Sequence, residues 1–368
     1  MINPERKNRL RPVFKKEQPG GFYHQLKNRV ADTIISQSRR AQVISWCKVV
    51  IYPALYLVCY SLLLINGNNK LWFYCCYGCM GLLTTLIVFN IVHDAVHQAL
   101  FRGKTANARA ALSLDILGGN SFVWSKRHVI FHHSFTNIPG WDIDIQQSKI
   151  VRFTEKQQYL KAYRYQHFYM PVLYLFYSLN WILLRDFKDF FDHKSVTRQH
   201  VKIPLKEYVK LYCFKTFHWI YIAWLPAFIL QQSVLAIILG ILLMHALMSA
   251  LTLLVLLPSH LDEDAHFPEA DEHLMLEDSW AVHQLKVTND FGTNNPVLNF
   301  VMGGLNHHIA HHLFPNVNHN IITGITAHIR SEAKKQSLPY KCYSLKQVMI
   351  SHLKLLKKAG QLRHVLEE

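Results

Sequence analysis

Histidines gather in three short segments of this 368-residue chain, and their type and spacing fit metal chemistry. The histidines of these segments are His93, His97, His128, His132, His133, His308, His311 and His312. Histidines three or four residues apart lie on one face of a helix, and neutral imidazole is a common ligand of transition metals. Eight imidazoles are more than one tetrahedral zinc ion binds. The pattern therefore favours two metal ions with open coordination positions.

The first two segments each contain a pair of histidines at helical spacing. His93 and His97 are four residues apart and follow directly after an apolar stretch. His128 and His132 repeat this spacing, and His133 stands beside them. We expect each pair to share one face of a helix.

The third segment, N-H-H-I-A-H-H, allows two registers. His308, His311 and His312 form the pattern H-x-x-H-H, whereas His307 lies four residues before His311 and is the alternative to His308. Both registers place two histidines on one helical face, so spacing leaves the choice open. We expect His308 to be the ligand.

Polar side chains near the first two segments could orient the histidines. Asp94 and Gln98 lie within or next to the first segment, and Asp142 and Asp144 follow the second. The ring N–H that points away from a metal commonly donates to such a group. We expect these side chains to fix the orientation of the ligand rings.

Four apolar stretches must position the histidines. They cover about residues 49–65, 71–92, 211–230 and 234–257, each near the ~20 residues that cross a bilayer as a helix. Short polar turns join them into two hairpins. A fifth stretch at 168–184 is short for a span and is interrupted by Pro171, Ser178 and Asn180. Spanning there would separate the third histidine segment from the other two across the membrane, so we expect an interfacial or buried helix. The predicted fold is all-α, a four-transmembrane-helix protein with a cytosolic helical cap that holds the histidines.

The charge distribution predicts the orientation of these spans. The formal net charge is +16, from 40 Lys and Arg against 24 Asp and Glu, and the two turns contain one lysine between them. Because basic residues collect on the cytoplasmic side of membrane proteins, we expect the histidine segments and both termini to be cytoplasmic, with a bacterial inner membrane as the location. No nucleic-acid-binding motif accompanies the charge, so we expect a lipid bilayer and no nucleic acid as partner.

The same reasoning divides the chain into three parts. Residues 1–45 form a basic cytosolic N-terminal segment, in which Phe22–Ile35 has the apolar spacing of a surface-lying helix. Residues 46–257 form the membrane domain, with a cytosolic insertion at 93–210. Residues 258–368 form a cytosolic C-terminal cap that carries the third histidine segment.

Together the three segments resemble the histidine boxes of the membrane fatty acid desaturase family. The family pattern is H-x-x-x-H, H-x-x(x)-H-H and [HQ]-x-x-H-H. The chain carries H-D-A-V-H, H-V-I-F-H-H and H-I-A-H-H at these places. The flanking strings at Thr136–Asp144 and His311–Pro315 match as well, and the similarity is greatest to bacterial desaturases of the linoleoyl-CoA or front-end type.

The resemblance implies a ninth histidine ligand upstream of the third box. His283 is the best match for it, and the alternatives are His260, His266 and His273. The resemblance further implies two iron ions (a di-iron site) and O2 as co-substrate. The expected reaction is abstraction of hydrogen from an acyl methylene to give a cis double bond. A related hydroxylase of alkyl, sphingolipid or carotenoid chains would use the same histidines, and a non-enzymatic metal carrier would bind zinc instead of iron.

The resemblance also predicts partners. The substrate is a long acyl chain, carried on CoA, a carrier protein or a lipid. Many front-end enzymes have Gln at the first position of the third box and a fused cytochrome b5 domain, whereas this chain has His308 there and no match to such a domain. We therefore expect a separate electron donor, such as a ferredoxin or cytochrome b5.

Overall fold

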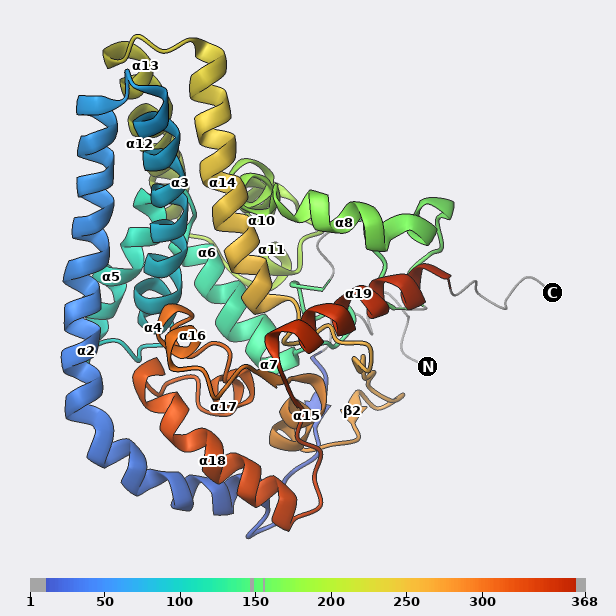
Figure 1. Cartoon of the computed structure of the whole chain (residues 1–368). Coiled ribbons are helices and arrows are strands. Elements are labelled where there is room, and N and C mark those ends of the chain that lie inside the picture. Colours follow the sequence, from blue (N-terminus) through green and yellow to red (C-terminus); the bar gives the residue numbers. More distant parts are fainter. Residues whose placement is uncertain (1–10, 146–148, 155, 362–368) are drawn as a thin grey trace.

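The computed structural model of the chain is mostly helical (Figure 1) and describes residues 11–145, 149–154 and 156–361. Among these residues, three helical stretches are long and apolar enough to cross a membrane. They are α2 (Phe22–Asn66), α14 (Val234–Leu256) and the continuous Lys70–Val96, which comprises α3 (Lys70–Ile87), the π-helical η1 (Val88–Val92) and α4 (His93–Val96). These stretches cover three of the four predicted spans.

The fourth predicted span is helical but interrupted. It comprises α12 (Leu205–Trp219), the π-helical η5 (Ile220–Trp224) and α13 (Leu225–Ile229). Pro226 has no N–H with which to bond the carbonyl of Ile222 four residues earlier. That carbonyl instead accepts from the Tyr77 hydroxyl of α3 at 2.7 Å, and the neighbouring Tyr221 carbonyl accepts from Tyr60 of α2 at 2.8 Å. Tyrosines of the first hairpin thus satisfy the backbone where this helix is irregular.

The two hairpins touch at their tips. The backbone N–H of Gln231 donates to the side-chain oxygen of Asn68 at 2.7 Å. The side-chain amide of Gln232 donates to the Gly67 carbonyl at 2.8 Å. Within the bundle α3 packs closely against α14, because Gly81 has no side chain. A Cβ there would lie 2.2 Å from the Met244 carbonyl oxygen.

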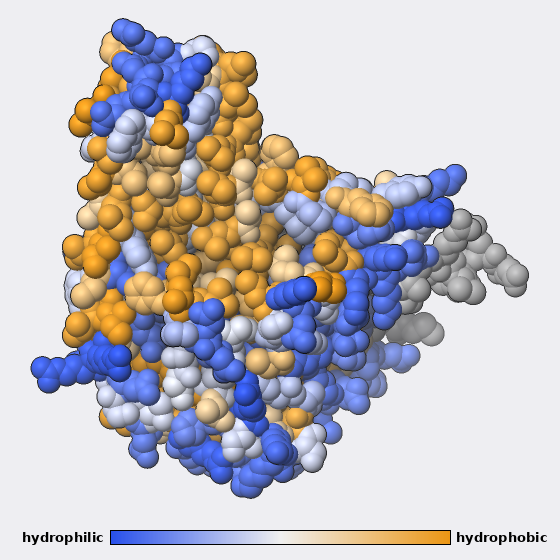
Figure 2. Space-filling view, viewed as in Figure 1, coloured by the Kyte–Doolittle hydropathy of each residue, from blue (hydrophilic) through white to orange (hydrophobic). Residues whose placement is uncertain are grey.

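A broad apolar surface covers the tall helices between a polar tip and a polar base (Figure 2). The exposed apolar side chains of these helices include Val50, Leu57, Val58, Leu71, Phe228, Val234, Leu235 and Leu239. Soluble monomers rarely expose so large an apolar patch, whereas lipid favours helices with such a surface. The surface therefore supports the prediction of a membrane protein.

The first half of α2 packs inside the polar base of the molecule. It lies beside α18 (His319–Lys335), where Phe22, Leu26 and Val30 are buried against the side chains of α17 (His308–Leu313) and α18. The apolar face of the predicted surface-lying helix is thus buried against the protein, while its other side is exposed. Helix α2 also runs unbroken through the predicted boundary at residue 45, and residues 1–10 of that segment lie outside the described part of the chain.

Shorter elements complete the base. The helices are α5 (Lys104–Ile116), α6 (Ser121–Ser125), η2 (Lys126–His132), α7 (His133–Phe135), η3 (Lys161–Tyr165), α8 (Gln166–Tyr174), α9 (Tyr177–Asn180), η4 (Trp181–Arg185), α10 (Asp186–Phe191), α11 (Val196–His200), α15 (Trp280–Val287), α16 (Pro296–Val301) and α19 (Leu345–Gln361). Two parallel strand pairs join β1 (Val13–Phe14) to β2 (Met275–Leu276) and β3 (Asp290–Phe291) to β4 (Cys342–Tyr343). These two pairs are the part of the fold that an all-α prediction lacks.

The stretch 168–184 is neither a span nor one helix. It is divided among α8, α9 and η4, and with α19 the first of these forms a projection beside the bundle (Figure 1). Phe168 and Val172 are exposed on α8. In contrast, Ser178 is buried and its hydroxyl lies 2.9 Å from Nδ1 of His245 in α14. The first half therefore has an exposed apolar face, as an interfacial helix requires, and the second half is partly buried, with Ser178, Trp181 and Ile182 inside and Leu183 and Leu184 exposed.

Candidate metal centre

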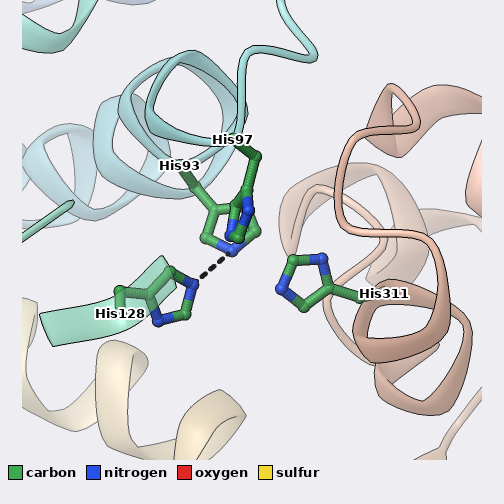
Figure 3. Close-up of side chains that lie close together, drawn as sticks. All are labelled: His93, His97, His128 and His311. Carbon is green, nitrogen blue, oxygen red and sulfur yellow. Dashed lines mark hydrogen bonds between the residues drawn. The ribbon is translucent and has the colours of Figure 1, made fainter. Parts of the chain in front are cut away.

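Four histidines from the three segments converge on one point in the base of the bundle (Figure 3). His93 and His97 come from the end of the second apolar stretch, His128 from η2 and His311 from α17. One nitrogen atom of each ring lies within 4.8 Å of the others. His93 and His128 approach most closely, with 3.1 Å between their Nε2 atoms.

A second group of four histidines lies next to the first. It consists of His132, His260, His308 and His312, whose ring nitrogens also lie within 4.8 Å of one another. The Nε2 atoms of His308 and His260 are 2.8 Å apart. Both groups are buried, so neither is a chance cluster on the surface.

His133 lies between the groups. Its Nε2 atom is 3.2 Å from that of His128 and 3.0 Å from that of His311. Its ring stacks on that of His312, with 4.3 Å between the centroids. Nine histidine side chains thus form one continuous cluster.

A widened helical turn explains how the second segment serves both groups. In η2 the His133 N–H bonds the carbonyl of His128, five residues earlier, as in a π-helix. His133 therefore lies beside His128, while His132 turns toward the second group. His128 and His132 belong to different four-histidine groups, but their rings still stack, with 5.5 Å between centroids, so they keep the predicted common face. His93 and His97 lie in the same group, as predicted.

The electrostatics of the cluster suit metal binding. Burial, and then the neighbouring histidines, hold the pKa values of His97, His128 and His311 well below the usual range. The same causes lower the pKa values of His133 and His312. These rings are therefore neutral and keep a lone pair for a metal.

The nitrogen separations are compatible with metal ions bound between the rings. A transition metal about 2.1 Å from two nitrogens at right angles places them about 3 Å apart, close to the 2.8–3.2 Å between neighbouring Nε2 atoms here. Neither ring nitrogen of His97, nor Nε2 of His312, has a hydrogen-bond partner among the described residues. Buried polar atoms rarely lack partners, and metal ions bound between the rings would satisfy them.

In two rings of the second group, the opposite nitrogen is hydrogen-bonded to the protein. Nδ1 of His308 donates to the Leu305 carbonyl at 2.9 Å, and Nδ1 of His312 donates to the side-chain oxygen of Gln284 at 2.9 Å. Such bonds fix the tautomer and leave Nε2 free for a metal.

The Nδ1 atom of His132 faces the carboxylate of Asp142. Nδ1 of His132 lies 3.2 Å from both oxygens of Asp142, and 3.7 Å from the nearer oxygen of Asp144. Burial lowers the pKa of His132, but these two carboxylates, Asp142 above all, outweigh it and raise the pKa. The expected role of the aspartates after the second segment therefore fits the geometry, with Asp142 the closer partner.

The structure does not bring His283 into either group. Its Nε2 lies 2.9 Å from the Thr136 carbonyl oxygen, and its ring packs edge-on against Phe14. His260 takes the expected place of the ninth histidine, because the turn after α14 directs it inward. One signal was available in the sequence: His260 directly follows an apolar span, as His93 does.

The remaining sequence-based candidates are also outside the groups. His307 is turned toward α18 and hydrogen-bonds Thr326 at 2.8 Å, so the register with His308 is the one that reaches the cluster. His266 and His273 belong to neither group. Gln98 bonds the Ala95 carbonyl at 3.2 Å instead of a histidine.

Comparison with known proteins agrees with this site. A fatty acid desaturase family model matches residues 71–344. The chain is 31% identical over 294 residues to the sn-1 linoleoyl-lipid 6-desaturase of Synechocystis sp., which covers 77% of this chain and 80% of the relative. It is 30% identical over 262 residues to a protein of the same name from Arthrospira platensis (69% of each). It is 26% identical over 355 residues to Delta(5) fatty acid desaturase A of Dictyostelium discoideum (93% and 76%). The chain belongs to the fatty acid desaturase family, and it is an oxidoreductase that desaturates acyl chains.

Proposed function

We propose that this desaturase binds two iron ions and uses O2 to introduce a cis double bond into a long acyl chain of a membrane lipid. The proposed ligands are His93, His97, His128, His132, His133, His260, His308, His311 and His312. The observation that carries this proposal is the pair of buried four-histidine groups with His133 between them. When bound, the metals would supply the redox chemistry that an unactivated C–H bond needs and that side chains cannot supply.

The protein's own contribution is to hold the rings and exclude water. The ligand rings are nearly inaccessible to solvent, and the bond from His308 to the Leu305 carbonyl and that from His312 to Gln284 keep these two rings in one orientation. Trp124 stacks on His128, with 5.1 Å between centroids and 10° between planes. Trp124 in turn packs against Trp181. These two indoles give the first group a rigid apolar neighbour suited to an acyl chain.

We infer four membrane spans in two hairpins, with the histidines on the cytoplasmic side. The irregular helix from Leu205 to Ile229 supplies the fourth span, and tyrosines satisfy its backbone as a membrane requires. The hydrogen bonds between the turns at Gly67–Asn69 and Gln231–Ser233 support a topology with both hairpin tips on one side of the membrane. Few basic residues lie at these tips, which favours the opposite side as cytoplasmic.

The substrate carrier is proposed from the relatives and from a surface cavity. Two relatives are named as desaturases of a linoleoyl-lipid. A cavity of about 520 Å³ opens beside the first two histidine segments, with Val96 and Val129 in its wall. Arg109, Lys126 and Lys210 also line it, and such cations suit a phosphate headgroup. An acyl lipid anchored here would have its ester end next to the histidines.

Product analysis tests this function. The full chain is expressed in a host that lacks polyunsaturated lipids, with fatty acids supplied, and lipids are examined for new double bonds by mass spectrometry. A cis double bond in lipid-bound chains, absent with the His128→Ala variant, is the expected result. A hydroxylated product would establish the related hydroxylase instead, and no product together with one zinc per chain would establish a metal carrier.

A second assay separates the acyl carriers. Purified enzyme in vesicles receives an external electron donor, a ferredoxin or cytochrome b5, and either a labelled acyl lipid or labelled acyl-CoA. We expect turnover of the lipid-bound chain, with a higher KM after Arg109→Ala. Turnover of acyl-CoA alone would overturn the proposed carrier while leaving the desaturase reaction intact.

A further inference from the structure

A buried lysine in the first apolar helix is connected to the first histidine group. Lys48 is 3% exposed and belongs to α2, far in sequence from every histidine segment. Its Nζ lies 2.8 Å from the side-chain oxygen of Asn90, 2.9 Å from Nε2 of His319 and 3.2 Å from the side-chain oxygen of Asn320. An ammonium group has three protons to donate, so these three acceptors match it completely.

The surrounding amides confirm the direction of these bonds. The Asn90 side-chain nitrogen donates to the Leu86 carbonyl at 2.9 Å. The Asn320 side-chain nitrogen donates to Asn318 at 2.9 Å. Both amide oxygens are therefore left to face Lys48. Because an ammonium cannot accept a hydrogen bond, Nε2 of His319 must be the acceptor, and its proton is on Nδ1.

His319 transmits this constraint to Asp94. Nδ1 of His319 lies 2.6 Å from one carboxylate oxygen of Asp94, and the His319 backbone N–H donates to the same oxygen at 3.0 Å. The other oxygen faces Nδ1 of His93 at 3.6 Å. That distance is too long for a hydrogen bond, but it is short for an electrostatic contact between buried groups.

We propose that Lys48 is a positioning residue for the first metal site: through His319 it fixes the Asp94 carboxylate that faces the ligand His93. This inference rests on the proposed metal site. The three side chains come from α2, α18 and α4, so the connection holds the C-terminal part of the chain against the first histidine segment.

The two histidine groups differ in the contacts of the aspartate that faces a ligand histidine. In the second group Asp142 faces His132 and accepts the backbone N–H groups of Asn137 and Asp144. Among the described residues, no lysine donates to Asp142. Behind the second group the cations are arginines instead: Arg127 and Arg185 pair with Asp144, which is 3.7 Å from Nδ1 of His132. Among the described residues the lysine–histidine–aspartate connection thus lies behind the first group, and the two bound metals are expected to be electronically inequivalent.

Metal retention and spectroscopy test the inference without relying on activity. The full-length protein is loaded with iron-57, exposed to increasing chelator and measured for iron per chain and by Mössbauer spectroscopy. For Lys48→Met we expect one of the two iron signals to change and the corresponding iron to be lost at about 10-fold to 100-fold lower chelator, as for other residues that support metal ligands. Lys48→Arg retains the charge and donors and is expected to restore most of the retention.

Lys215 provides a matched control. It is also a buried lysine with three acceptors, the Asp186 carboxylate and the carbonyls of Gly118 and Ile182, at 2.6–2.7 Å. Lys215→Met therefore removes a comparable buried charge away from the histidine groups. It is expected to lower the melting temperature but leave both iron signals unchanged. If Lys48→Met also lowers only the melting temperature, Lys48 is merely structural and the proposal is overturned.

His319 variants decide the question if Lys48→Met does not fold. His319→Gln keeps an acceptor for Lys48 and a donor for Asp94, whereas His319→Leu removes both. We expect the Gln variant to retain iron and the Leu variant to lose the iron bound by His93. Equal retention by the two variants would refute the connection. Absence of iron from the wild-type protein would instead contradict the proposed function itself.

Discussion

Comparing iron retention by the variants His260→Ala and His283→Ala gives the sharpest test of the proposed ligand set. The sequence favoured His283, whereas the geometry favours His260, whose Nε2 is 2.8 Å from that of His308. His260→Ala leaves three histidines in the second group. Even residues that only support a ligand change metal affinity about 10-fold to 100-fold, so loss of a direct ligand should cost at least about 100-fold in iron retention at that site.

His283→Ala is the matched comparison. It removes the hydrogen bond to the Thr136 carbonyl and the contact with Phe14, but no group member. An unpaired buried carbonyl costs about 1–3 kcal/mol, so the variant should melt at a lower temperature yet keep both metals.

The assay is iron per chain after chelator treatment, by mass spectrometry of the metal, with melting temperature as the measure of stability. The expected pattern is loss of one iron of two for His260→Ala and of none for His283→Ala. The reverse pattern would show that the ligand assignment from geometry is wrong, and that the sequence resemblance located the ninth ligand correctly.

Three further predictions concern other parts of the molecule. Asp142→Asn removes the charge that faces His132, and iron retention at the second site should fall about 10-fold to 100-fold. Burial lowers the pKa of His352 to about 4. The unfolded chain therefore binds this proton more readily, and stability is lost as pH falls from about 6.5 toward 4. The melting temperature of His352→Gln should fall less over that range, and an unchanged slope would contradict this. Gly81→Val places side-chain atoms against the Met244 backbone, so we expect poor yield of folded protein in detergent; wild-type yield would refute the close helix contact.

The sequence predicted most of the histidine cluster because each segment carries its own signal. His93, His97 and the third-segment histidines stand at helical spacing, and span parity places the segments on one side. For His260 the only signal was its place just after an apolar span, because it lies in a turn whose direction depends on contacts with residues far along the chain, such as Val287. Lys48 is similar: its role depends on α18, which the sequence does not place beside α2.

The geometry of the irregular helices also could not be predicted from the sequence. The third apolar stretch was predicted as a regular span, but its helix is irregular around Pro226, and the tyrosine hydroxyls that satisfy its backbone come from another hairpin. In η2 the wider turn sends His128 and His132 to different groups, which α-helical spacing cannot predict. Local pattern thus predicted the elements, while tertiary contacts decided the register at the site.

The positions of the histidines along the chain determine when each group is completed during translation. His311 completes the first group and lies 178 residues after its neighbour His133. At about 5–20 residues per second, a ribosome needs on the order of 10–40 s to cover that distance. During this time the first hairpin is in the membrane, and the first group consists of His93, His97 and His128 without His311. With the proposed ligand set, metal insertion is therefore a late step in biogenesis, and a chain stopped before the third segment has neither site complete.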